Sequence, residues 1–184
     1  MSLLWIFGWL LAVRLFEVVI SGLHRRALLA RGGREFFPAS FQRIALMHGL
    51  FIAALALESF PWIIPLDLLS YACLAVLAGL QVGRWWCMAA LGENWNVRII
   101  VVPGEGRKRT GPYRWIRHPN YLLVVLEFVF LPLLMRAFIT MAVFSIANLL
   151  LLRQRIRLEE MALAHDAAAR AMVGEGAVEY VRLK

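Results

Sequence analysis

The sequence is poor in charged residues. Only 17% of its 184 residues are Asp, Glu, Lys or Arg, whereas a soluble domain usually carries about 25%. Apolar residues make up 61% of the chain, and its mean hydropathy is +0.69. This composition excludes an ordinary soluble domain and is typical of a protein that spans a membrane.

Cysteine and histidine are scarce as well. Cys73 and Cys87 lie 14 residues apart, within or beside apolar runs, and this spacing is not that of a metal or redox motif. His24, His48 and His165 are isolated along the chain. We therefore predict no metal site, and no Ser–His–Asp or Cys–His grouping indicates a catalytic nucleophile.

Acidic residues are outnumbered by basic ones. The chain has 12 Asp and Glu against 20 Lys and Arg, a formal net charge of +8. In a soluble protein this excess would favour nucleic acid as a partner. Here the basic residues lie between apolar runs, so we expect them to contact membrane lipids, and we expect no nucleic-acid partner.

The apolar residues form runs long enough to cross a bilayer, which takes about 20 residues. The runs are Leu3–Ile20, Ile44–Phe60, Ile63–Ala90 and Tyr121–Leu152. Tyr121–Leu152 is too long for one crossing, and Pro132 and Arg136 lie in its middle. We therefore divide it into a helical hairpin that turns near Leu134–Ala137. This gives about five transmembrane helices, with four as the alternative.

The positions of the basic residues favour five helices. Residues 24–43, residues 92–120 and the tail from Arg153 hold five, six and six of the 20 Lys and Arg. Five crossings put these segments on one side of the membrane, whereas four would put the tail on the other. The positive-inside rule then predicts an external N-terminus and a cytoplasmic C-terminus. Trp85, Trp86 and Trp95 are expected at the membrane interface.

A few polar residues lie inside the apolar runs. Arg14 and Glu17 are three residues apart, so they share a helical face and can pair. Such residues normally face the protein interior. Glu127 and Asn148 are the other two polar residues expected at the midplane of the runs. A transporter would need more polar residues at the midplane, so this pattern favours a site at the cytoplasmic interface.

The polar segment Gly92–Tyr121 separates the third run from the hairpin. It reads GENWNVRIIVVPGEGRKRTGPYRWIRHPNY, with a β-prone stretch at 97–102. Pro119 suits the first position of a helix, where free backbone N–H groups would bind an anion. The alternative is a basic loop that contacts lipid phosphates.

A second polar cluster, RIRLEE, follows the hairpin. Arg155 and Glu159 are four residues apart and share one helical face. They either form an ordinary ion pair at a solvated helix end or face one pocket together.

The motifs TGPYRWIRHPNY and RIRLEE, with the apolar hairpin between them, resemble the C-terminal core of the isoprenylcysteine carboxyl methyltransferase family. The resemblance covers roughly residues 95–180. The stretches RLFEVVISGLHRRALLARGGREF and WNVRIIVVPG resemble a bacterial branch whose members methylate alkylpyrone or alkylresorcinol lipids. A bacterial inner membrane is the location that this branch implies.

The resemblance implies S-adenosylmethionine as the methyl donor. Tyr113 and the stretch His118, Pro119, Asn120 and Tyr121 match the cofactor-binding motif. Glu159 matches a carboxylate that contacts the cofactor. Arg155 matches an arginine on the substrate side, close to the reacting centre, and is the expected catalytic residue.

The expected fold is an all-α polytopic membrane protein in two parts. Residues 1–91 would hold three transmembrane helices and a basic cytoplasmic loop at 23–43. Residues 92–184 would form the catalytic core, with a cofactor-binding loop, the hairpin 121–152 and a C-terminal cytoplasmic helix.

The expected reaction is methyl transfer to an oxygen of a lipophilic small molecule: a carboxylate, an enol or a phenol. Two alternatives stay open. A phospholipid N-methyltransferase has a related core, but an amine acceptor gives Arg155 no task. A non-catalytic scaffold or a small transporter is the alternative from another class.

Overall fold

In the computed structural model, which describes residue 2 and residues 4–182 and the side chains up to residue 168, the chain forms five α-helices. They are α1 (Leu4–Ala30), α2 (Pro38–Glu58), α3 (Leu68–Leu91), α4 (Pro119–Leu134) and α5 (Phe138–Arg182). Two short strands and two 3₁₀ turns connect them: β1 (Arg34–Phe36), η1 (Gly92–Asn94), β2 (Ile99–Val101) and η2 (Gly111–Arg114). The prediction of an all-α membrane protein is confirmed, and the β-prone stretch 97–102 contains β2.

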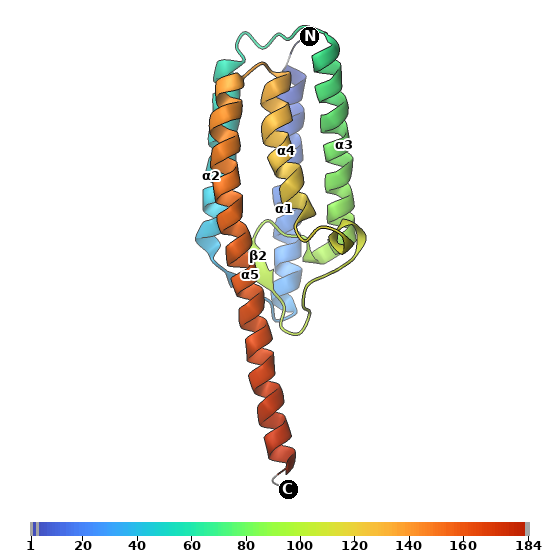
Figure 1. Cartoon of the computed structure of the whole chain (residues 1–184), viewed down its shortest axis with the longest axis vertical. Coiled ribbons are helices and arrows are strands. Elements are labelled where there is room, and N and C mark those ends of the chain that lie inside the picture. The colour runs from blue at the N-terminus through green and yellow to red at the C-terminus, as the bar shows by residue number, and fades with distance from the viewer. Residues whose placement is uncertain (1, 3, 183–184) are drawn as a thin grey trace.

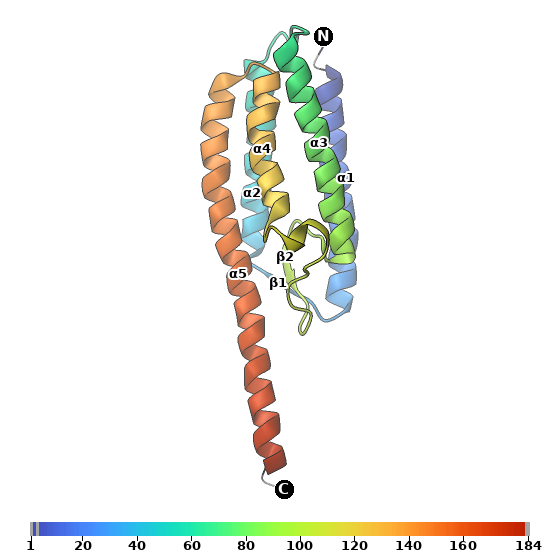
Figure 2. The same ribbon diagram turned by 45° about the vertical axis from the view of Figure 1, so that its right-hand side comes forward.

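Four segments of the described chain are long and apolar enough to cross a membrane. They are Leu4–Ala30, Pro38–Glu58, Leu68–Asn94 and Phe138–Ala168. The remaining helix, α4, is also apolar but has only 16 residues. Its length of about 24 Å is less than the ~30 Å thickness of the hydrocarbon core. The chain is an integral membrane protein in which α4 stands at the centre of the bundle, packed against α3 and α5 (Figures 1 and 2).

The hairpin turns where the sequence predicts it. α4 ends at Leu134, and α5 begins at Phe138. Glu58, at the end of α2, caps the start of α5, because its carboxylate accepts hydrogen bonds from the N–H groups of Ile139 (2.8 Å) and Thr140 (2.7 Å). The second arm of the hairpin does not stop at the membrane surface: it continues into the C-terminal helix, so that α5 is one helix of 45 residues.

Aromatic stacking holds the helices together. Phe51 of α2 stacks on Phe128 of α4, with ring centroids 4.1 Å apart. Phe128 and Leu55 are among the most deeply buried side chains. This core fixes the position of α4, and the first turn of α4 contributes to the candidate site.

A small sheet joins two connecting segments at one end of the bundle. β1 follows α1, β2 follows η1, and the two pair antiparallel with Arg34 opposite Val101. Ser2 pairs with Ile63 at the opposite end, near the N-terminus (Figure 1). The sheet brings two of the basic segments together, and a hydrogen bond from Arg43 to Gln154 (3.1 Å) adds the start of the third.

Candidate active site

A cavity of about 140 Å³ lies at the sheet end of the bundle, where the first turn of α4 meets α5 and the segment before β2. Its lining includes six of the seven residues that the sequence singled out: Tyr113, His118, Asn120, Tyr121, Arg155 and Glu159. The seventh, Pro119, is buried and is the first residue of α4. The structure therefore brings together residues from three separate parts of the chain.

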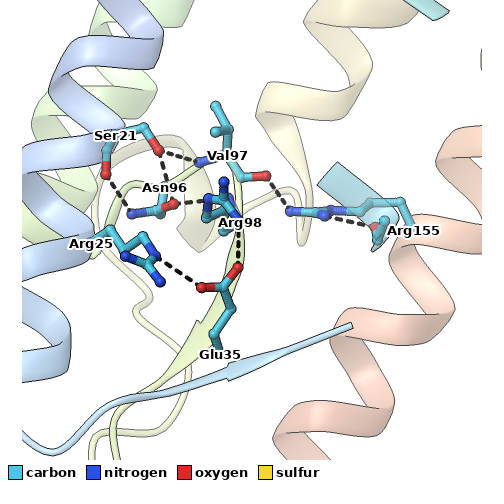
Figure 3. Close-up of polar contacts among 8 residues, drawn as sticks. Ser21, Arg25, Glu35, Asn96, Val97, Arg98 and Arg155 are labelled. Atoms are coloured by element: carbon cyan, nitrogen blue, oxygen red, sulfur yellow. Dashed lines mark hydrogen bonds and ion pairs between the residues drawn. The ribbon is translucent and has the colours of Figure 1, made fainter. Parts of the chain in front are cut away.

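Arg155 is buried in this cavity, with only 4% of its surface exposed. Its Nη1 donates to Ser40 Oγ (2.8 Å), and its Nη2 donates to the carbonyl oxygen of Val97 (2.6 Å; Figure 3). Its Nε donates to the hydroxyl oxygen of Tyr121 (3.3 Å). A guanidinium has five N–H donors, so one N–H on each terminal nitrogen is left for another acceptor. Such a fork suits an anionic oxygen.

Tyr121 connects Arg155 to Glu159. Its hydroxyl donates to Glu159 Oε2 (2.7 Å) while it accepts from Arg155 Nε. The two charged residues thus face one pocket, as their spacing allows, but a phenol lies between them. They do not form a direct ion pair.

Glu160 on α5 holds the segments on both sides of η2, because it contacts Arg107 before η2 and His118 after it. His118 stacks on the Tyr121 ring, with centroids 5.3 Å apart and an interplanar angle of 12°. Its Nε2 lies 3.1 Å from Glu160 Oε1, and Arg107 forms an ion pair with the same carboxylate. Glu159 and Glu160 both lie near His118, whose Nδ1 is 3.9 Å from Glu159 Oε1, but Glu160 also pairs with Arg107 whereas Glu159 accepts from Tyr121.

Two polar groups of the cavity differ in their partners: within the described part of the chain Asn120 has a free oxygen, whereas the Tyr113 hydroxyl is hydrogen-bonded to Cys87. Asn120 Oδ1 is buried and has no hydrogen-bond partner among the described residues. Burial raises the pKa of the Tyr113 phenol, and the neighbouring Cys87 and Glu159 raise it further. The Tyr113 hydroxyl therefore stays protonated at physiological pH and remains a donor.

A second cavity, of about 280 Å³, extends from the same residues toward the membrane. Five residues line both cavities: Trp95, Asn96, Asn120, Tyr121 and Arg155. A third cavity, of about 370 Å³, lies deeper in the bundle between α1, α2, α3 and α4. It shares Arg14, His48 and Ile52 with the second cavity. An apolar path thus leads from the membrane interior to Arg155.

Several residues of the site cannot be identified from the sequence. Ser40 and Val97 hold Arg155, yet they are 115 and 58 residues away from it. Trp95 is 3% exposed, so it packs inside the protein and does not contact lipid, whereas Trp85 and Trp86 are about half exposed. The His24 ring contacts the Trp95 carbonyl oxygen (2.7 Å), so His24 supports the wall of the cavity.

Comparison with known proteins assigns the family. The profile of the isoprenylcysteine carboxyl methyltransferase (ICMT) family matches residues 72–165, which include every sequence-predicted residue of the cavity. The chain belongs to the ICMT family. The uncharacterized protein YpbQ of Bacillus subtilis is 36% identical over 162 residues, covering 84% of this chain and 92% of that protein. An uncharacterized protein of Haemophilus influenzae is 29% identical over 160 residues, covering 86% of this chain and 93% of that protein.

No solved structure matches the chain. Membership of the ICMT family implies a membrane methyltransferase that uses S-adenosylmethionine and a lipophilic acceptor.

Proposed function

We propose that this protein is an integral membrane O-methyltransferase. It would transfer the methyl group of S-adenosylmethionine to a carboxylate, enol or phenol oxygen at the head of a lipophilic acceptor. The observation that carries this proposal is the position of Arg155, which lies between a polar cavity and an apolar one and keeps two N–H donors free.

The polar cavity suits the cofactor. Bound S-adenosylmethionine supplies a methyl group activated by a sulfonium. The Glu159 carboxylate provides a negative charge for a cationic part of the cofactor, and Tyr113 lines the same cavity. The unpartnered Asn120 oxygen, on the boundary between the cavities, suits the positively polarised methyl group. Tyr113 and Glu159 also line an adjoining cavity of about 140 Å³, which gives a long ligand more room.

The apolar cavities suit the acceptor. Arg155 would hold the acceptor oxygen in line with the methyl group, and this orientation supplies much of the rate. The tail would lie in the two apolar cavities and reach them from the bilayer between the helices. Arg14 lines the junction between these cavities, but Glu17 and Glu127 balance its charge, so an apolar chain can pass.

The same contacts weigh against the alternatives. A protonated amine beside Arg155 would place two cations together, so a phospholipid N-methyltransferase is disfavoured. In the membrane-spanning part, Arg14 pairs with both Glu17 and Glu127, so these charges are satisfied within the protein and are not left for a transported solute.

S-Adenosylhomocysteine should bind the purified protein and raise its apparent stability. At about 100 times the dissociation constant the gain is roughly 2.7 kcal/mol, measurable as a thermal shift in detergent. Glu159→Ala and His118→Ala should weaken binding, because each alters the polar cavity. His165→Ala, on an exposed part of α5, is the matched control and should bind normally. A melting temperature that stays constant over all concentrations would contradict the cofactor assignment.

The site should face the cytoplasm, where S-adenosylmethionine is made. A reporter fused after Lys184, which lies outside the described residues, should therefore give a cytoplasmic signal. A fusion at the N-terminus should give an external one, in keeping with the positive-inside rule. The reverse pair of signals would contradict the proposed orientation, and two signals on the same side would exclude the five-helix topology.

A further inference from the structure

The peptide group of Val97 is held on both sides (Figure 3). Its carbonyl oxygen accepts from Arg155, and its N–H donates to Ser21 Oγ (3.1 Å) on α1. Asn96 completes the arrangement: its Oδ1 accepts from Ser21 Oγ (2.9 Å) and from the Arg98 N–H (2.8 Å), and its Nδ2 donates to the Ser21 carbonyl oxygen (3.0 Å).

The Val97 carbonyl is the partner of Arg155 whose position depends most on this arrangement. Ser40 and Tyr121 belong to α2 and α4, so the helices themselves place them. Val97 lies outside helices and strands, between η1 and β2. Its hydrogen bond to Ser21, together with the hydrogen bonds of Asn96, fixes the peptide plane. Ser21 is buried, with 2% of its surface exposed, so losing its hydroxyl leaves groups without partners.

We infer that Asn96 and Ser21 are positioning residues for methyl transfer, and that they act by orienting the Arg155 guanidinium through the Val97 carbonyl. The inference rests on the proposed function, because it assumes that Arg155 holds the acceptor. Both free N–H donors of Arg155 turn with the guanidinium plane, and the hydrogen bond from Nη2 to the Val97 carbonyl oxygen fixes that plane. Asn96 itself lines both cavities, so it lies at the boundary that the methyl group would cross from the cofactor to the acceptor.

The same network contains a natural control. Glu35 on β1 accepts from Arg98 Nη1 (2.6 Å) and from Arg25 Nε (2.9 Å), on the side of the segment that is farther from Arg155 (Figure 3). Burial raises the pKa of the Glu35 carboxyl, but the hydrogen bonds from Arg98 and Arg25 lower it by more. The net pKa lies below the usual value, so the carboxylate is ionised at neutral pH. Glu35→Gln therefore weakens two ion pairs without touching the Val97 peptide.

The test uses membranes that contain the full-length protein, with methyl-labelled S-adenosylmethionine as the probe. The initial rate of methyl transfer is measured as label that enters the organic extract. This rate is divided by the number of S-adenosylhomocysteine-binding sites, so that unfolded protein does not contribute to it. Asn96→Ala and Ser21→Ala should lower this rate about 10- to 100-fold, the scale of a small misplacement of a reacting group. The apparent KM for S-adenosylmethionine should change little, and Ser21→Thr, which keeps the hydroxyl, should restore most of the rate.

A double-mutant cycle decides how Asn96 acts. In the Arg155→Lys background, where the guanidinium is gone, adding Asn96→Ala should change the rate by no more than about twofold. Equal losses in both backgrounds, or a loss with Glu35→Gln as large as with Asn96→Ala, would overturn the inference. Failure of the unaltered protein to transfer any label would contradict the proposed function instead.

Discussion

Arg155→Ala is expected to lower methyl transfer by roughly 10²- to 10³-fold, the usual cost of removing one preorganised donor from a reacting oxygen. The affinity for S-adenosylhomocysteine should change little, because Arg155 lies on the boundary with the apolar cavity whereas Glu159 lies deeper on the cofactor side. Activity and affinity should be measured on the same preparations. A loss of both to the same extent would mean that Arg155 only supports the cavity.

Two further variants sharpen this result. Arg155→Lys should restore the rate only in part, because an ammonium cannot bond Ser40, Val97 and Tyr121 and still present a fork to the acceptor. Arg157→Ala removes an exposed guanidinium from the same helix, two residues away. It should leave the rate near that of the unaltered protein, and a large loss there would indicate a general effect of charge at the membrane surface.

The sequence correctly placed two residues of the candidate site on one face of a helix. Arg155 and Glu159 are one turn apart, and the helical repeat is enough to put them on one face. The Tyr121 hydroxyl between them was not predictable, because it depends on how α4 packs against α5. Ser40 and Val97 were also missed, since their contacts with Arg155 join segments that no local pattern connects.

The fold shows the same division between local and distant features. Apolar runs located the helices, and the turn after α4 was placed correctly near Leu134. The sequence contains no Pro or Gly between Phe138 and Gly174, so α5 continues through the point where the chain becomes charged. The pairing of β1 with β2 was not predicted, because strands of three residues carry too little pattern to indicate a partner 65 residues away.

Four charged residues within the membrane-spanning helices form one neutral cluster across three helices. Arg14 on α1 bonds Glu17 Oε2 and Glu127 Oε2, both at 2.6 Å. Arg84 on α3 bonds Glu127 Oε2 at 2.5 Å and approaches Glu17 Oε1 at 3.4 Å. The Arg14–Glu17 pair follows from their spacing, whereas the partners on α3 and α4 appear only in the folded chain. The cluster has two positive and two negative charges, so each charge is balanced only while the other three are present.

Removing one charge from this cluster should destabilise the protein strongly. The Arg84 side chain is 2% exposed and that of Glu127 is 12% exposed, so Glu127→Leu leaves an uncompensated cation away from water. Such a change costs about 3–5 kcal/mol, which should appear as a large fall in the unfolding midpoint in detergent. Arg84→Met should cost a similar amount for the opposite charge. By contrast, Arg31→Ala breaks ion pairs with Glu93 and Glu105 that are partly open to water, and each should cost no more than about 1 kcal/mol.

The double variant Arg84→Met with Glu127→Leu tests whether charge balance is the cause. It removes one cation and one anion, and Arg14 keeps its bond to Glu17. Its midpoint should therefore lie well above those of the two single variants, because apolar side chains of similar volume often replace a buried ion pair at little cost. If the two losses simply add, the cluster stabilises the bundle through packing rather than through its neutrality. Methyl transfer by the double variant should persist, since neither residue touches the bonds that hold Arg155.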